Sequence, residues 1–162
     1  MSTETYTLIH VVISLIGIGS GLVVLYGLLT GKQLDRWTAL FLVTTILTSV
    51  TGFFFPIHQV TPALIVGVIS LVLLAIAILA RYSRRLAGAW RWIYVVCAAM
   101  ALYLNVFVLV AQSFMKVPAL KAMAPTQSEP PFMVAQVVVL LILIVLTVVA
   151  VRKFRGEALR TA

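Results

Sequence analysis

The chain has 162 residues, of which 63% are hydrophobic and only 10% are charged, with a formal net charge of +8. A soluble domain is nearer a quarter charged, because it must cover its surface with polar groups. The composition therefore excludes a water-soluble globular domain and predicts a protein surrounded mostly by lipid.

Five uncharged runs follow one another along the chain, and each is long enough to cross a bilayer as a helix. At about 1.5 Å per residue, about 20 residues match a hydrocarbon core of roughly 30 Å. Such runs must be helical, because no water inside the bilayer can satisfy the backbone amides. The sequence predicts one all-α domain over residues 1–162, a bundle of five transmembrane helices with spans at about 8–29, 37–55, 63–80, 92–115 and 132–151.

The basic residues predict the orientation of these helices, since Lys and Arg flanking the spans are retained in the cytoplasm. Ten of the 12 lie in the first and third connections and the C-terminal tail, and only Lys116 and Lys121 lie in the fourth connection. We therefore expect the N-terminus outside and the C-terminus in the cytoplasm. The basic loops are also expected to contact anionic lipid. Nucleic acid is excluded as a partner, because no basic stretch has interleaved aromatic residues.

Small and weakly polar side chains predict where the helices pack, because apolar surface gains little by leaving lipid for protein. Gly17 and Gly21 are four residues apart in the first run, a spacing that lets two helices approach closely. This common spacing favours packing within the chain over a homodimer, although a homo-oligomer stays open. The expected packing residues are Gly17, Gly21, Thr48, Gly52, Gly67 and Ser70.

Strongly polar residues gather at the predicted outer face. Asn105, Gln112 and Lys116 share one stripe of the fourth run, and His10 and Ser14 share another on the first. If both stripes face inward, a polar pocket opens outward between the first, fourth and fifth spans, beneath the 16-residue connection 116–131. Within that connection, residues 117–124 could form a short interfacial helix, and it stays open whether the connection lies on the membrane surface or folds into the bundle. The candidate ligand-binding residues are His10, Ser14, His58, Gln59, Asn105, Gln112, Lys116, Gln127, Glu129 and Gln136.

Three interpretations of these polar residues stay open. In the first, the side chains only tie the helices together beneath a rigid proline-rich cap. In the second, they bind a lipid, a quinone head group or another small hydrophobic ligand, or they contact another membrane protein. In the third, His10 and His58 hold haem b or copper, although no zinc-type or haem-attachment spacing is present. Neither of the first two interpretations requires a cofactor.

Enzymatic and ion-coupled functions are disfavoured by the few acidic residues. Glu4, Asp35, Glu129 and Glu157 are the only four, and none lies in a predicted span. Coupled carriers usually place a charged residue near the midplane, and here Asn105 is the only strongly polar group that deep. No nucleophile elbow, phosphate-binding loop or His-Glu-x-x-His motif is present. The protein is thus more like an accessory subunit or binding component than an enzyme.

Three stretches between residues 102 and 132 carry a resemblance to a family of proteins. The sequences Leu-Tyr-Leu-Asn-Val-Phe-Val at 102–108, Gln-Ser-Phe-Met-Lys-Val-Pro-Ala-Leu at 112–120 and Ala-Pro-Thr-Gln-Ser-Glu-Pro-Pro-Phe at 124–132 resemble an uncharacterised family of small multi-pass bacterial inner-membrane proteins. This resemblance implies a location in the bacterial inner (plasma) membrane and transfers no activity. His10, Gly17 and Gly21 are loosely similar to a helix of membrane haem proteins, whose paired intramembrane histidines this chain lacks.

These observations lead to one expectation and one alternative. We expect a small integral inner-membrane protein that acts as a non-enzymatic accessory or ligand-binding component, with its polar working surface on the outer (periplasmic) face. The alternative is a haem- or metal-binding membrane redox protein that uses His10 and His58.

Overall fold

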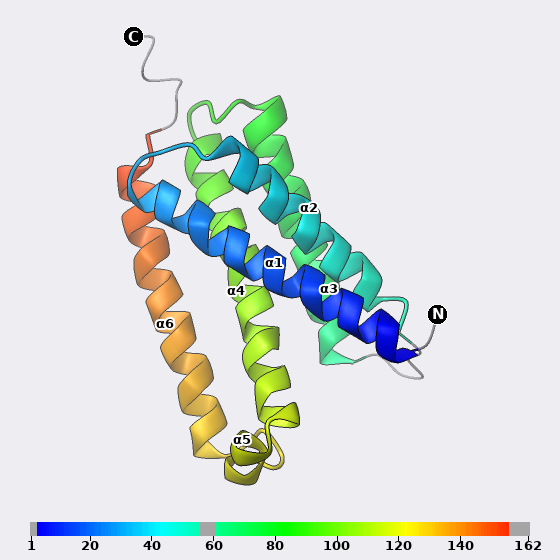
Figure 1. The fold of residues 1–162 in the computed structure, drawn as a ribbon. Coiled ribbons are helices and arrows are strands. Elements are labelled where there is room, and N and C mark those ends of the chain that lie inside the picture. The colour runs from blue at the N-terminus through cyan, green and yellow to red at the C-terminus, as the bar shows by residue number, and fades with distance from the viewer. Residues whose placement is uncertain (1–2, 56–60, 156–162) are drawn as a thin grey trace.

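The structure is a computed structural model that describes residues 3–55 and 61–155. All regular structure in these residues is helical, which confirms the all-α class. His58 and Gln59 lie outside the described residues. The helices in chain order are α1 (Thr3–Leu29), α2 (Asp35–Gly52), α3 (Pro62–Ile78), the π-helical turn η1 (Leu79–Ser83), α4 (Trp90–Lys116), α5 (Pro118–Met123) and α6 (Pro130–Lys153) (Figure 1).

Four helical segments of the described chain are long and apolar enough to cross a membrane, as expected of a multi-pass membrane protein. They are Thr3–Leu29, Pro62–Ser83, Trp90–Lys116 and Pro130–Lys153. The second predicted span corresponds to α2, which is not among them although it has 18 residues. Two charged residues, Asp35 and Arg36, and six Ser or Thr residues lower its mean hydropathy.

The helix ends differ from the predicted runs, and a capping residue or a proline accounts for two of these differences. α3 begins at Pro62, and the Thr61 hydroxyl caps it by accepting a bond from the backbone N–H of Leu64. α2 ends at Gly52, three residues before the predicted end of the run. Pro56 follows in the sequence, and proline disfavours helical backbone at the residue before it. The predicted short helix in the fourth connection is confirmed as α5.

Successive long helices run in opposite directions, so their ends gather at two ends of the bundle (Figure 1). One end holds residues 28–36, 81–91 and 152–155 and is called the basic end below. The other holds the start of α1, the end of α2, the start of α3 and α5, and is called the α5 end. α4 is central, since it contacts α1, α3 and α6.

The buried core lies closer to the basic end. In α1 every buried residue comes at or after Gly17, and in α4 only Phe114 is buried after Leu102. Figure 1 shows the reason: α1 and α2 lean away from α4 and α6 toward the α5 end. The bundle is therefore tightly packed at the basic end and loosely packed at the α5 end.

α1 makes its closest approach to its neighbours at Gly21. A Cβ atom added there would lie 2.7 Å from Cδ1 of Leu102 and 2.8 Å from Cε2 of Phe41. Real side chains do not approach so closely, so only glycine allows α1 to cross α2 and α4 at this point. One turn earlier, a Cβ on Gly17 would lie 3.3 Å from the Thr44 hydroxyl oxygen.

Candidate functional site

His10 joins α1 to the end of α2 rather than standing alone. Its Nδ1 atom is 2.7 Å from the hydroxyl oxygen of Thr51, and its ring meets the Phe55 ring edge-on at 5.1 Å. The Tyr6 hydroxyl, one turn earlier, donates to the Thr51 carbonyl oxygen at 2.6 Å. A Cβ on Gly52 would lie 3.8 Å from the His10 ring. These contacts hold the two helices together at the α5 end.

Ser14 is satisfied within its own helix. Its hydroxyl donates to the His10 carbonyl oxygen at 2.7 Å, the usual i−4 bond of serine in a helix. Ser14 is half-buried, as His10 is. The predicted stripe on α1 therefore lies along the contact with α2.

Asn105 lies where α1, α2 and α4 meet. Its Nδ2 donates to the Thr45 hydroxyl oxygen at 3.2 Å, and a Cβ on Gly17 would be 3.6 Å from the same nitrogen. An amide bonded between helices in lipid stabilises their association by up to about 2 kcal/mol. Asn105 thus ties α4 to α2 close to the small surface of Gly17.

Gln127 and Gln136 tie the segments after α4 back to that helix. The Nε2 atom of Gln127 donates to the Ala111 carbonyl oxygen at 2.6 Å, and that of Gln136 donates to the Phe107 carbonyl oxygen at 3.1 Å. Gln136 is only 8% exposed, and its Oε1 has no partner among the described residues. A buried acceptor without a donor costs about 1–3 kcal/mol, so the Gln136 amide is only partly satisfied within the described chain.

Glu129 organises the turn before α6. Its carboxylate accepts bonds from the backbone N–H and the hydroxyl of Thr126, at 3.1 Å and 2.8 Å, and from the N–H of Ser128 at 3.1 Å. Desolvation acts to raise the pKa of this carboxyl, but these hydrogen bonds outweigh it and hold the pKa below its ordinary value. The carboxylate therefore shapes the turn.

Gln112 and Lys116 stay exposed on the last turns of α4. In the described chain no hydrogen bond joins His10 or Ser14 to either residue. The cause is the divergence of α1 from α4 toward the α5 end. The two polar stripes therefore lie on helices that separate toward the α5 end (Figure 1).

Other parts of the described chain add no enclosed site. A shallow hollow lies over the first turns of α1, lined by Thr3, Glu4, Thr7, Leu8 and Val11. Within residues 3–55 and 61–155, no group of three or more His, Cys, Asp or Glu side chains could hold a metal ion.

Two of the expected packing residues carry hydroxyls that make no hydrogen bond in the described chain. The Thr48 and Ser70 hydroxyl oxygens are both buried. Gly67 packs on the Phe53 ring, since a Cβ there would lie 3.2 Å from it.

Sequence reasoning missed a charged cluster at the basic end. Arg81 is buried, forms an ion pair with Asp35, and places its guanidinium 5.3 Å from the centre of the Tyr94 ring. Tyr94 is fully buried and packs against Phe154. A signal was present: Arg81 continues the stripe of buried residues at i, i+4, i+7 and i+11 on α3, namely Ser70, Leu74, Ala77 and Arg81.

No protein family, curated protein or solved structure matches this chain. Its candidate site is therefore defined by the geometry of its own residues.

Proposed function

We propose that the chain is a small integral protein of the bacterial inner membrane that acts as a non-enzymatic accessory or ligand-binding component. Its working surface is the α5 end, which faces the outside. The observation that carries this proposal is the uneven packing: polar side chains border the loosely packed end of a bundle whose other end is closed.

The proposal includes α2 as a fifth span. Its hydroxyl-bearing residues Thr38, Thr45 and Ser49 are buried against neighbouring helices. Exposed positions such as Val43 and Leu47 are apolar. The mean hydropathy of the whole helix therefore understates how apolar its lipid-facing side is. In addition, 18 helical residues at about 1.5 Å each nearly span the hydrocarbon core.

The orientation follows from where the charges lie in the fold. Nine of the described Lys and Arg residues are at the basic end, against two, Lys116 and Lys121, at the α5 end. This asymmetry favours the basic end in the cytoplasm. A reporter enzyme that works only in the cytoplasm, fused after residue 162, should be active. Activity of a periplasmic reporter at the same position would contradict the orientation.

The ligand that these residues fit is a small amphiphile, such as a lipid or quinone, held beside α4. Gln136 Oε1 favours a hydroxyl or amide donor on the ligand. Gln112 and Lys116, both exposed near the end of α4, supply further donors. The surrounding apolar helix faces suit a hydrocarbon tail.

Mass spectrometry of organic extracts from the purified protein tests this proposal. We expect a lipid or quinone at close to one molecule per chain, and about tenfold less in Gln112→Leu/Lys116→Ala, because a lost charged hydrogen bond is worth about 1.5–3 kcal/mol. Lys153→Ala, which removes one positive charge at the basic end, is the control and should retain the ligand. Equal retention in all three proteins would refute the site.

The redox alternative is tested with the same sample. His10 is held by Thr51, and His58 lies outside the described residues. A Soret band, or stoichiometric copper, that disappears in His10→Ala would replace the proposal above with haem or metal binding. A colourless, metal-free protein would leave the ligand-binding proposal in place.

A further inference from the structure

The basic end carries positive charge that the described chain does not neutralise. Only three acidic residues are described. Glu4 and Glu129 lie at the α5 end, and Asp35 is paired with Arg81. No other ion pair is present in residues 3–55 and 61–155. The exposed or half-buried basic residues left at this end are Lys32, Arg36, Arg84, Arg85, Arg91, Arg152, Lys153 and Arg155.

The fold gathers three of these arginines around the first turn of α4. The Arg84 guanidinium lies 5.2 Å from the centre of the Trp90 ring, and Arg91 is the next residue along α4. Nη1 of Arg91 donates to the carbonyl oxygen of Arg155 at 3.4 Å. Nε of Arg91 is buried and has no partner among the described residues. This contact brings the backbone of Arg155 beside the Arg91 side chain, although the two residues are 64 positions apart in the sequence.

A constrained turn holds Arg84 in this position. Arg85 and Leu86 have φ values of 50° and 57°, which non-glycine residues rarely adopt. Leu86 is buried, and its N–H donates to the Ala80 carbonyl oxygen at 3.0 Å, so the turn is fixed at its centre. The arginines are therefore presented from a defined backbone.

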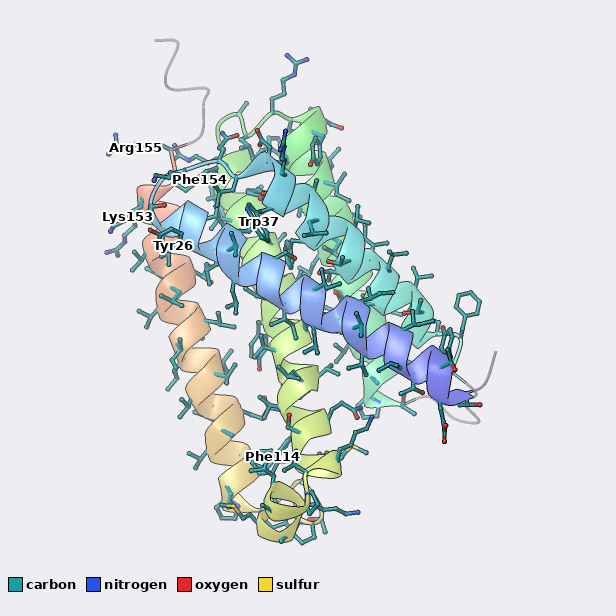
Figure 2. All side chains as sticks on the ribbon, viewed as in Figure 1. Tyr26, Trp37, Phe114, Lys153, Phe154 and Arg155 are labelled. Atoms are coloured by element: carbon teal, nitrogen blue, oxygen red, sulfur yellow. The ribbon has the colours of Figure 1, made fainter. Side chains whose placement is uncertain are left out.

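Exposed aromatic side chains favour a position of these arginines near the depth of lipid head groups. Tyr26 and Trp37 are exposed at the basic end, where Figure 2 also shows Lys153 and Arg155, with Phe114 at the opposite end. Trp92, two residues after Trp90, is exposed as well. Exposed Trp and Tyr in membrane proteins favour the interface between hydrocarbon and water. Phosphate groups of the lipids lie at this level.

We propose that Arg84, Arg91 and Arg155 form a binding site for the phosphate of an anionic phospholipid. The planar guanidinium matches phosphate oxygens with two parallel hydrogen bonds, and within the described residues none of the three groups forms an ion pair. The acyl chains of the lipid lie along the apolar faces of α4 and α6. This site is separate from the surface proposed at the α5 end.

Native mass spectrometry of the full-length protein in detergent tests the site, with phosphatidylglycerol and phosphatidylcholine at equal concentration as probes. We expect about tenfold preference for phosphatidylglycerol, lost in Arg84→Gln/Arg91→Gln. The matched control Lys32→Gln/Lys121→Gln removes the same charge from positions outside both proposed binding sites and should keep the preference. Equal loss in both double variants would reduce the effect to net charge and overturn the site.

One further variant and one competing anion complete the test. Arg155→Gln, whose side chain makes no described hydrogen bond, should weaken phosphatidylglycerol binding about threefold even if the double variant fails to fold. Binding that Arg155→Gln leaves unchanged would overturn the three-arginine site. Inorganic phosphate at millimolar concentration should displace little of the lipid, because it lacks acyl chains. Full displacement would assign the site to a soluble anion instead of a lipid.

Discussion

Replacing Gly21 with alanine should destabilise the bundle, because the added methyl group has no room. Its Cβ would lie 2.7 Å from Leu102 Cδ1 and 2.8 Å from Phe41 Cε2, and both of these side chains are 1% exposed. Carbon atoms in contact prefer separations of about 3.5–4.0 Å, so α1 must move by about 1 Å or two buried side chains must leave their rotamers. Overpacking of this kind costs about 1–3 kcal/mol, which corresponds to a change of roughly 5- to 150-fold in the unfolding equilibrium.

Two other glycines of α1 provide graded controls. A Cβ on Gly19 would meet nothing within 4 Å, so Gly19→Ala should leave stability unchanged or slightly raised, since alanine is the better helix former. A Cβ on Gly17 would lie 3.3 Å from the Thr44 hydroxyl oxygen, which predicts an intermediate cost of about 1 kcal/mol.

Equilibrium unfolding in mixed micelles, followed by circular dichroism while the SDS fraction is increased, ranks the three variants. We expect the midpoint to fall in the order Gly19→Ala, Gly17→Ala, Gly21→Ala. If Gly21→Ala unfolds at the same SDS fraction as Gly19→Ala, then α1 does not cross α2 and α4 at Gly21, and the reasoning is refuted.

Three further perturbations test other contacts. Asp35→Asn leaves the buried Arg81 guanidinium without its carboxylate and should cost about 2 kcal/mol in the same unfolding assay. A double-mutant cycle with Arg81→Met should return a coupling of similar size, and a coupling near zero would show that the pair contributes nothing. Asn105→Leu removes the amide bond between α4 and α2 and should cost about 1 kcal/mol. Because the pKa of Glu129 is lowered, its turn is stabilised above the ordinary glutamate pKa and loses this stabilisation as the pH falls through the lowered value. Protection of the Thr126 amide from hydrogen exchange should therefore decrease in acid, and Glu129→Gln should abolish this extra pH dependence.

The sequence by itself determined the class of structure and the approximate place of each long helix. Lipid leaves helices as the way to satisfy the backbone of a long apolar run, so the composition of those runs was sufficient. The ends of the helices were less accurate, because local signals such as the Thr61 cap and Pro56 act within a few residues of a run's boundary. The sequence also predicted that most basic residues lie at one end, because the connections between successive spans lie alternately on the two sides of the membrane.

Only the tertiary structure decided which side chains meet. His10 bonds to Thr51, 41 residues away, and Arg81 pairs with Asp35, 46 residues away. Such partners depend on how far each helix is rotated and tilted against its neighbours, and no local pattern encodes a tilt. The divergence of α1 from α4 is a property of this kind: Gly21 allows one close crossing, and the helices separate toward the α5 end, so in the described chain no hydrogen bond joins the two polar stripes.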